Sequence, residues 1–98
     1  MKVNYVTLNI TDEILDKYGE NILETIYKST EGWMGYTEEF GATWFSSDID
    51  KKHIFTSLEY GGLMVSGRMI EEEWNEWLEN FLAIASKKFG FKIYDIEE

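Results

Sequence analysis

The chain contains no cysteine and no proline, and it has one histidine and one arginine among its 98 residues. The absence of cysteine excludes a disulfide framework, a thiolate zinc site and a cysteine nucleophile. One imidazole without a thiol cannot build a histidine-rich metal site. We interpret His53, which follows two lysines at the start of a predicted strand, as a solvated residue without a catalytic role.

Long apolar runs and targeting signals are also missing. The apolar stretches extend for only a few residues, whereas about 20 are needed to span a bilayer. The first residues show neither the apolar run nor the cleavage site of a signal peptide. We therefore expect a cytoplasmic protein.

Known catalytic and cofactor motifs are absent as well. The eight glycines include no phosphate-binding loop and no dinucleotide-binding pattern. Asp48-Ile49-Asp50 begins like a calcium loop, but Lys51, Lys52 and His53 stand where further oxygen ligands and a glycine are needed. We predict a protein that is not an enzyme and has no catalytic residues, metal site or cofactor.

The charge balance is strongly acidic. Nineteen acidic residues against nine basic residues give a formal net charge of −10 and a sequence pI near 4.5. Such a field repels nucleic acid and anionic membranes and attracts cationic partners. Arg68 is the only arginine and the lysines are scattered, which disfavours direct nucleic-acid binding. Solubility alone explains this much acidity equally well.

The composition supports one folded domain over residues 1–98, because 44% of the residues are hydrophobic and 16% are aromatic. Alternation over 2–10 predicts a strand with apolar groups on both faces, which favours a central position in a sheet. Thr11 and the acids after it predict a helix to about Ser29, which Gly19 can kink or split. Strands are predicted over 33–38, 40–47, 53–60 and 63–69, with a long loop as the alternative for the first, and a Gly61-Gly62 hairpin turn joins the last two.

Apolar residues at three- and four-residue spacing predict a helix over 71–89, with acids at its start, lysines at its end and Gly90 as its cap. Residues 91–96 are predicted as a last strand. The order strand, helix, strands, helix, strand predicts an α+β fold. We expect a mostly antiparallel sheet of four to six strands with two helices packed on one face.

Two acidic surfaces are candidates for partner binding. Residues 31–50 hold five acids, no base and five aromatic residues, and tyrosine and tryptophan are common interface anchors. The alternative is that about half of these aromatics belong to the core. The outer face of the last predicted helix carries like-charge neighbours, although a solvated helix face is a sufficient explanation for them. The predicted contact residues are Trp33, Tyr36, Glu38, Glu39, Asp48 and Asp50, with Glu72, Glu76 and Glu79 as the second candidate surface.

Residues 61–98 carry a resemblance to a known class of proteins. The residues concerned are Gly61-Gly62-Leu63, Gly67, Trp77, Phe81, Phe89-Gly90-Phe91 and the acidic end Asp95, Glu97 and Glu98. In architecture and charge this part resembles the small acidic immunity proteins of bacterial contact-dependent and polymorphic toxin systems. The resemblance implies a cytoplasmic antidote that binds one cognate toxin domain, often a nuclease, and occludes its active site. It transfers no family binding residue to this chain.

The favoured hypothesis is a non-enzymatic inhibitor that neutralises a basic protein partner, a cognate bacterial toxin first of all. One alternative is a phage-type DNA mimic that inhibits a nucleic-acid enzyme, which requires carboxylates spaced like phosphates. Another is a small ligand-binding module, which requires a closed pocket lined by aromatic residues. The oligomeric state stays open at this point.

Overall fold

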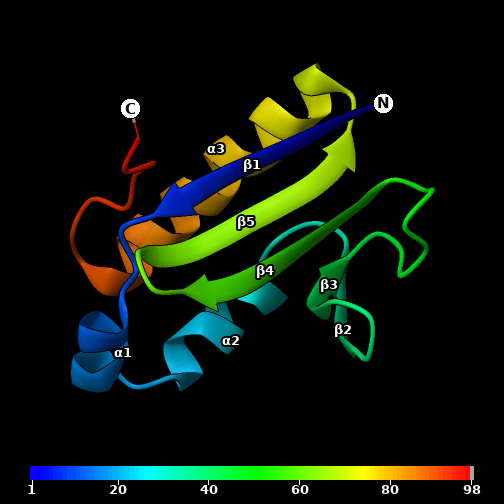
Figure 1. Cartoon of the computed structure of the whole chain (residues 1–98). Helices are drawn as coiled ribbons and strands as arrows, with labels where there is room; N and C mark the ends of the chain where they lie inside the picture. The colour runs from blue at the N-terminus through cyan, green and yellow to red at the C-terminus, as the bar shows by residue number, and fades with distance from the viewer. Residues whose placement is uncertain (98) are drawn as a thin grey trace.

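A five-stranded antiparallel sheet with three helices forms the α+β fold in the computed structural model, which describes residues 1–97 (Figure 1). Glu98, part of the acidic end quoted above, lies outside the described residues. The elements in chain order are β1 (Lys2–Leu8), α1 (Asp12–Tyr18), α2 (Asn21–Lys28), β2 (Trp33–Thr37), β3 (Gly41–Trp44), β4 (His53–Glu59), β5 (Gly62–Met69) and α3 (Glu71–Phe89).

The strands are arranged in the order β1-β5-β4-β3-β2, so β1 is an edge strand. The expectation of a central position for this strand was therefore wrong. Its inward residue Leu8 is fully buried under the helices, but the outward residues Val3 and Tyr5 are 64% and 63% exposed. Apolar residues on both faces of β1 thus reflect one buried face and one uncovered apolar face.

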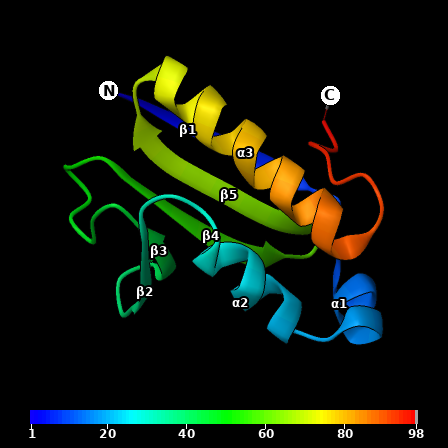
Figure 2. The same cartoon turned by 180° about the vertical axis from the view of Figure 1, so that it is seen from behind.

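The helices lie on one face of the sheet, with α3 along β1 and β5 and with α2 beside it (Figure 2). The predicted helix up to Ser29 is divided at Gly19, whose φ of +88° ends α1. This division gives three helices instead of two. The start of α1 is capped as predicted, because the Thr11 hydroxyl accepts a hydrogen bond from the Ile14 backbone N–H at 3.4 Å.

The β4–β5 hairpin and α3 are confirmed. Glu59 pairs with Gly62 at the end of the hairpin, and a Cβ atom at Gly62 would overlap the carbonyl oxygen of Leu8 on β1. Helix α3 ends at Phe89, and Gly90 in the left-handed conformation donates to the Ser86 carbonyl. Both elements follow from local patterns in the sequence.

The predicted strand over 91–96 was wrong. This segment makes only an isolated bridge from Asp95 to Leu8. Hydrogen bonds from the Asn9 side chain hold this segment in place of a strand ladder. The Asn9 Oδ1 atom accepts from the Tyr94 N–H at 2.8 Å, and the Nδ2 atom donates to the Lys92 carbonyl at 3.1 Å. Ile93 is nevertheless buried, so the segment adds to the core as a side-chain-anchored coil.

His53 is buried, which corrects its interpretation as a solvated residue. It lies on the sheet face opposite the helices, where the turn between β2 and β3 brings the Phe40 ring to a stacked position 4.9 Å away. Its Nδ1 is 2.8 Å from the Lys51 carbonyl oxygen. The covering ring comes from a distant turn, which explains why the neighbouring lysines were misleading.

Trp44 lies at the centre of the core and is fully buried. Its ring contacts those of Tyr27, Trp33 and Trp77 at centroid distances of 5.0, 5.0 and 5.4 Å. This aromatic cluster joins β3 to α2 and α3. Over residues 1–97, no helix has both the length and the apolar character required to cross a membrane.

Candidate acidic groove

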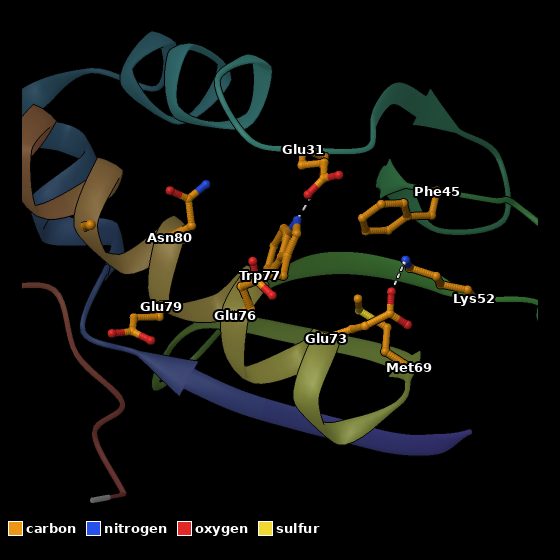
Figure 3. A pocket seen from close by; sticks show the side chains of 10 residues that line it. Glu31, Phe45, Lys52, Met69, Glu73, Glu76, Trp77, Glu79 and Asn80 are labelled. Atoms are coloured by element: carbon orange, nitrogen blue, oxygen red, sulfur yellow. Dashed lines mark hydrogen bonds and ion pairs between the residues drawn. The ribbon is translucent and has the colours of Figure 1, made fainter.

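An open groove of about 620 Å³ lies between α3, the segment after α2 and the loop between β3 and β4 (Figure 3). Its acidic side chains come from α3 and from the segment after α2, and its lysine comes from the β3–β4 loop. We call it the acidic groove. Its lining residues are Glu31, Phe45, Lys52, Met69, Glu73, Glu76, Trp77, Glu79, Asn80 and Ala83.

The floor of the acidic groove is formed by Trp77, which is 5% exposed. Its ring stacks on Phe81, 5.2 Å away in the core. Its indole Nε1 donates a hydrogen bond of 2.9 Å to the backbone carbonyl of Glu31. Trp77 therefore anchors the segment that carries Glu31 to α3 and fixes the width of the groove.

Phe45 forms a wall of the acidic groove because its backbone is in the left-handed region, with φ of +72°. Its N–H donates to the Gly32 carbonyl at 2.8 Å. A Cβ atom at Gly32 would lie 2.6 Å from the Phe45 Cδ1 atom, and the φ of Gly32 is +89°. Only glycine permits this close approach, so Gly32 is required for the position of the wall.

Four carboxylates and one ammonium group line the groove. The Lys52 Nζ atom is 2.8 Å from Glu73 Oε2 and lies 4.4 Å from the centre of the Phe45 ring. Figure 3 shows this pair at one end of the groove and Glu79 toward the other. Within residues 1–97, Glu31, Glu76 and Glu79 have no lysine or arginine within salt-bridge distance. These three negative charges remain available to a partner.

The chemistry of the groove suits a long cationic side chain. A lysine or arginine can lay its apolar stem on an aromatic surface while its charged end reaches carboxylates. Trp77 and Phe45 supply aromatic surface, of which the Phe45 ring already contacts Lys52, and Glu31 and Glu76 supply carboxylates beside it. In the described part of the chain, no three His, Asp or Glu side chains lie close enough together to hold a metal ion.

Nothing matched in the comparisons with known proteins. Neither the family models, nor the curated proteins, nor the solved structures include one that is similar to this chain. The assignment of a site therefore depends on the chain's own residues.

The predicted helix surface contributes to the acidic groove in part. Glu76 and Glu79 line it, whereas Glu72 is exposed on α3 outside it. Glu31 and Glu73 also line the groove, and neither is among the predicted contact residues. Trp77 is one of the apolar residues whose spacing predicts α3, and its role on the groove floor has no signal in the sequence, because Glu31 is 46 positions away.

The predicted loop surface lies outside the acidic groove. Trp33 is half-buried against Tyr27 and Trp44, while Tyr36 is 62% exposed. Glu38 and Glu39 lie in the turn between β2 and β3, and Asp48 and Asp50 lie in the loop between β3 and β4. A binding role for these six residues stays a prediction.

A second, smaller hollow of about 320 Å³ lies between the helices α1 and α2 and the strands β2 to β5. It is lined mainly by apolar side chains and by Tyr27 and Tyr36. Burial raises the pKa of Tyr36, and the nearby charge of Glu24 adds to this effect. Burial also raises the pKa of Tyr27 to about 12, although a hydrogen bond from the Thr56 hydroxyl partly opposes the shift.

The raised pKa of Tyr27 predicts a loss of stability in alkali. Between pH 10.0 and about 12 the unfolded chain loses the phenol proton and the folded protein retains it. The free energy of unfolding should then fall as pH rises through this window, by about 3 kcal/mol in all, since each pKa unit corresponds to roughly 1.4 kcal/mol. Urea unfolding of the wild type and of Tyr27→Phe measures this. If both proteins show the same slope with pH, the assignment to Tyr27 is wrong.

Proposed function

We propose that this protein is a non-enzymatic inhibitor that binds a basic protein partner through the acidic groove and occludes the partner's active site. One observation carries the proposal. Glu31, Glu76 and Glu79 line a concave surface with an aromatic floor, and within residues 1–97 none of them has a cationic neighbour at salt-bridge distance. A solvated acidic helix face needs neither the hollow nor the aromatic floor.

The binding mode follows from the properties of the groove. The net charge of −10 attracts a basic partner over a distance and increases the rate of association. At contact, lysine or arginine side chains of the partner enter the groove and pair with the carboxylates that have no cationic neighbour. Lys52 stays paired with Glu73 at one end, so the partner meets mainly the other three carboxylates.

The partner class is proposed from the resemblance to bacterial immunity proteins. A cognate toxin domain, such as a nuclease with a basic phosphate-binding cleft, has the required positive charge. An acidic protein seated in such a cleft excludes the nucleic-acid substrate by occupying the same charges. This mechanism needs no catalytic residue on the inhibitor.

Capture followed by an activity assay tests the proposal. The immobilised protein is expected to retain a basic polypeptide from an extract of the source organism at low salt and to release it at high salt, because screening weakens charge pairing. The purified polypeptide should lose its activity on titration with this protein, with the end point at one-to-one. The proposal is contradicted if the partner keeps full activity when it is saturated with this protein, or if its retention does not depend on salt.

A further inference from the structure

Within residues 1–97, no helix covers the sheet face opposite α2 and α3 over β1, β5 and β4 (Figure 1), and only the Phe40 ring lies over the start of β4. The pairing registers place alternate residues of these strands on this face. We call it the open face. Its residues are Val3, Tyr5 and Thr7 on β1, Met64, Ser66 and Arg68 on β5, and His53, Phe55, Ser57 and Glu59 on β4.

The open face is poor in charge although the chain is strongly acidic. Arg68 and Glu59 are the only residues in that set with a formal charge when His53 is neutral. Two copies that approach through their acidic helix sides repel each other. Two copies that approach through their open faces keep most carboxylates apart. Electrostatic repulsion therefore opposes self-association least on this face.

The open face also exposes apolar surface. Val3 and Tyr5 are 64% and 63% exposed. Along the other side, the Phe40 ring stacks with those of His53 and Phe55 at 4.9 and 5.0 Å and forms a raised aromatic wall. Exposed aromatic and aliphatic surface next to a charge-poor centre is typical of an interface core.

Among the described residues, Arg68 has no hydrogen-bond or ion-pair partner for its side chain. Its Nε atom is buried without a hydrogen-bond partner, and within residues 1–97 no carboxylate lies at salt-bridge distance from its guanidinium group. A buried donor without an acceptor is costly, and guanidinium groups pair well with carboxylates. The buried Nε atom is out of reach of another molecule, but the Nη atoms of the same guanidinium group are not buried and can accept an acidic group from outside the chain as a partner.

We propose that the open face is a homodimer interface in which Arg68 of each copy pairs with Glu59 of the other. Arg68 pairs with His53 at the start of β4, and exposed Glu59 lies at the end of that strand, about 20 Å away at roughly 3.4 Å per residue. A two-fold axis that lies in the plane of the interface, perpendicular to the strands, places the Arg68 end of one open face opposite the Glu59 end of the other. Each copy then donates one guanidinium and one carboxylate, as a self-complementary interface requires.

The dimer goes beyond the proposed function and leaves it intact. The acidic groove lies on the helix side, so each copy keeps its groove free for a basic partner (Figures 2 and 3). Loss of self-association and loss of partner binding can therefore be measured separately. Failure of one proposal does not imply failure of the other.

A charge-swap series measured by sedimentation velocity over a wide concentration range tests the dimer. The wild type is expected to dimerise reversibly. Arg68→Glu alone and Glu59→Arg alone should each raise the dimer dissociation constant at least roughly tenfold, since each places like charges opposite each other. The double variant Arg68→Glu/Glu59→Arg should restore it to within about threefold of the wild type, because it reverses the pair and keeps the attraction.

Lys92→Glu is the matched control, since it changes the net charge as Arg68→Glu does from an exposed position outside the open face. It should leave the dissociation constant within about threefold of the wild type. Glu59 is exposed, so its substitution tests the pairing without disturbing the core. The proposal is overturned if the wild type stays monomeric or if neither single variant changes the dimer dissociation constant. It is also overturned if the double variant dimerises more weakly than either single variant.

Discussion

Reversal of Glu76 and Glu79 together, as Glu76→Lys/Glu79→Lys, should weaken binding of a deca-lysine peptide about a hundredfold at moderate salt. Both carboxylates line the acidic groove, and the variant replaces two attractions by two repulsions. A hundredfold loss corresponds to about 2.7 kcal/mol, which two charge pairs near a protein surface can supply. Isothermal titration calorimetry measures the dissociation constant.

The control for this prediction is Glu13→Lys/Asp16→Lys on α1, which makes the same change in net charge at two exposed positions outside the acidic groove. We expect the control to bind the peptide within about threefold of the wild type at moderate salt, where distant charges are screened. Equal losses in the two double variants would mean that only net charge attracts the peptide, and the groove would then lose its assigned role.

The largest effect on stability is expected for Trp44→Ala. Trp44 is fully buried, and its ring contacts the rings of Tyr27, Trp33, Trp77 and Phe81. Truncation of a buried tryptophan costs about 3–5 kcal/mol, out of a total stability of roughly 5–15 kcal/mol for a typical domain. Urea unfolding should therefore show a free energy of unfolding that is lower than that of the wild type by about 3–5 kcal/mol.

Trp44→Phe separates ring packing from hydrogen bonding. The Trp44 Nε1 atom donates to the Thr30 hydroxyl at 2.6 Å, and phenylalanine keeps an aromatic ring while it loses this donor. The Thr30 hydroxyl still donates to the Tyr27 carbonyl at 2.7 Å, so the loss should be about 1–3 kcal/mol. An alanine variant that loses less than the phenylalanine variant would refute the central position of Trp44 in the core.

Local elements of the fold were predictable from sequence, whereas their lateral order was not. Helix α3 and the β4–β5 hairpin depend on spacing and turn residues within a short window, and both are confirmed. The edge position of β1 depends on which strand lies beside it, and alternation along one strand contains no such information. The strand predicted over 91–96 failed for a related reason, because the Asn9 side chain, 85 positions away, accepts the hydrogen bond of the Tyr94 N–H in place of a strand partner.

The acidic groove was predictable only through its helical side. Glu76 and Glu79 share one face of α3, which the helical period shows directly. The opposite side depends on the hydrogen bond from Trp77 to Glu31 and on the left-handed backbone of Phe45. Trp77 has the same spacing as its core neighbours, so the sequence does not reveal that its edge also forms the groove floor.

The most direct test of the account is an NMR titration of the ¹⁵N-labelled protein with deca-lysine. The indole N–H of Trp77, bonded to the Glu31 carbonyl, reports on the groove floor. We expect this signal and the backbone amides of Glu31 and of residues 73–80 to show the largest shifts. Largest shifts at Glu38, Glu39, Asp48 and Asp50, with the Trp77 indole unmoved, would contradict it.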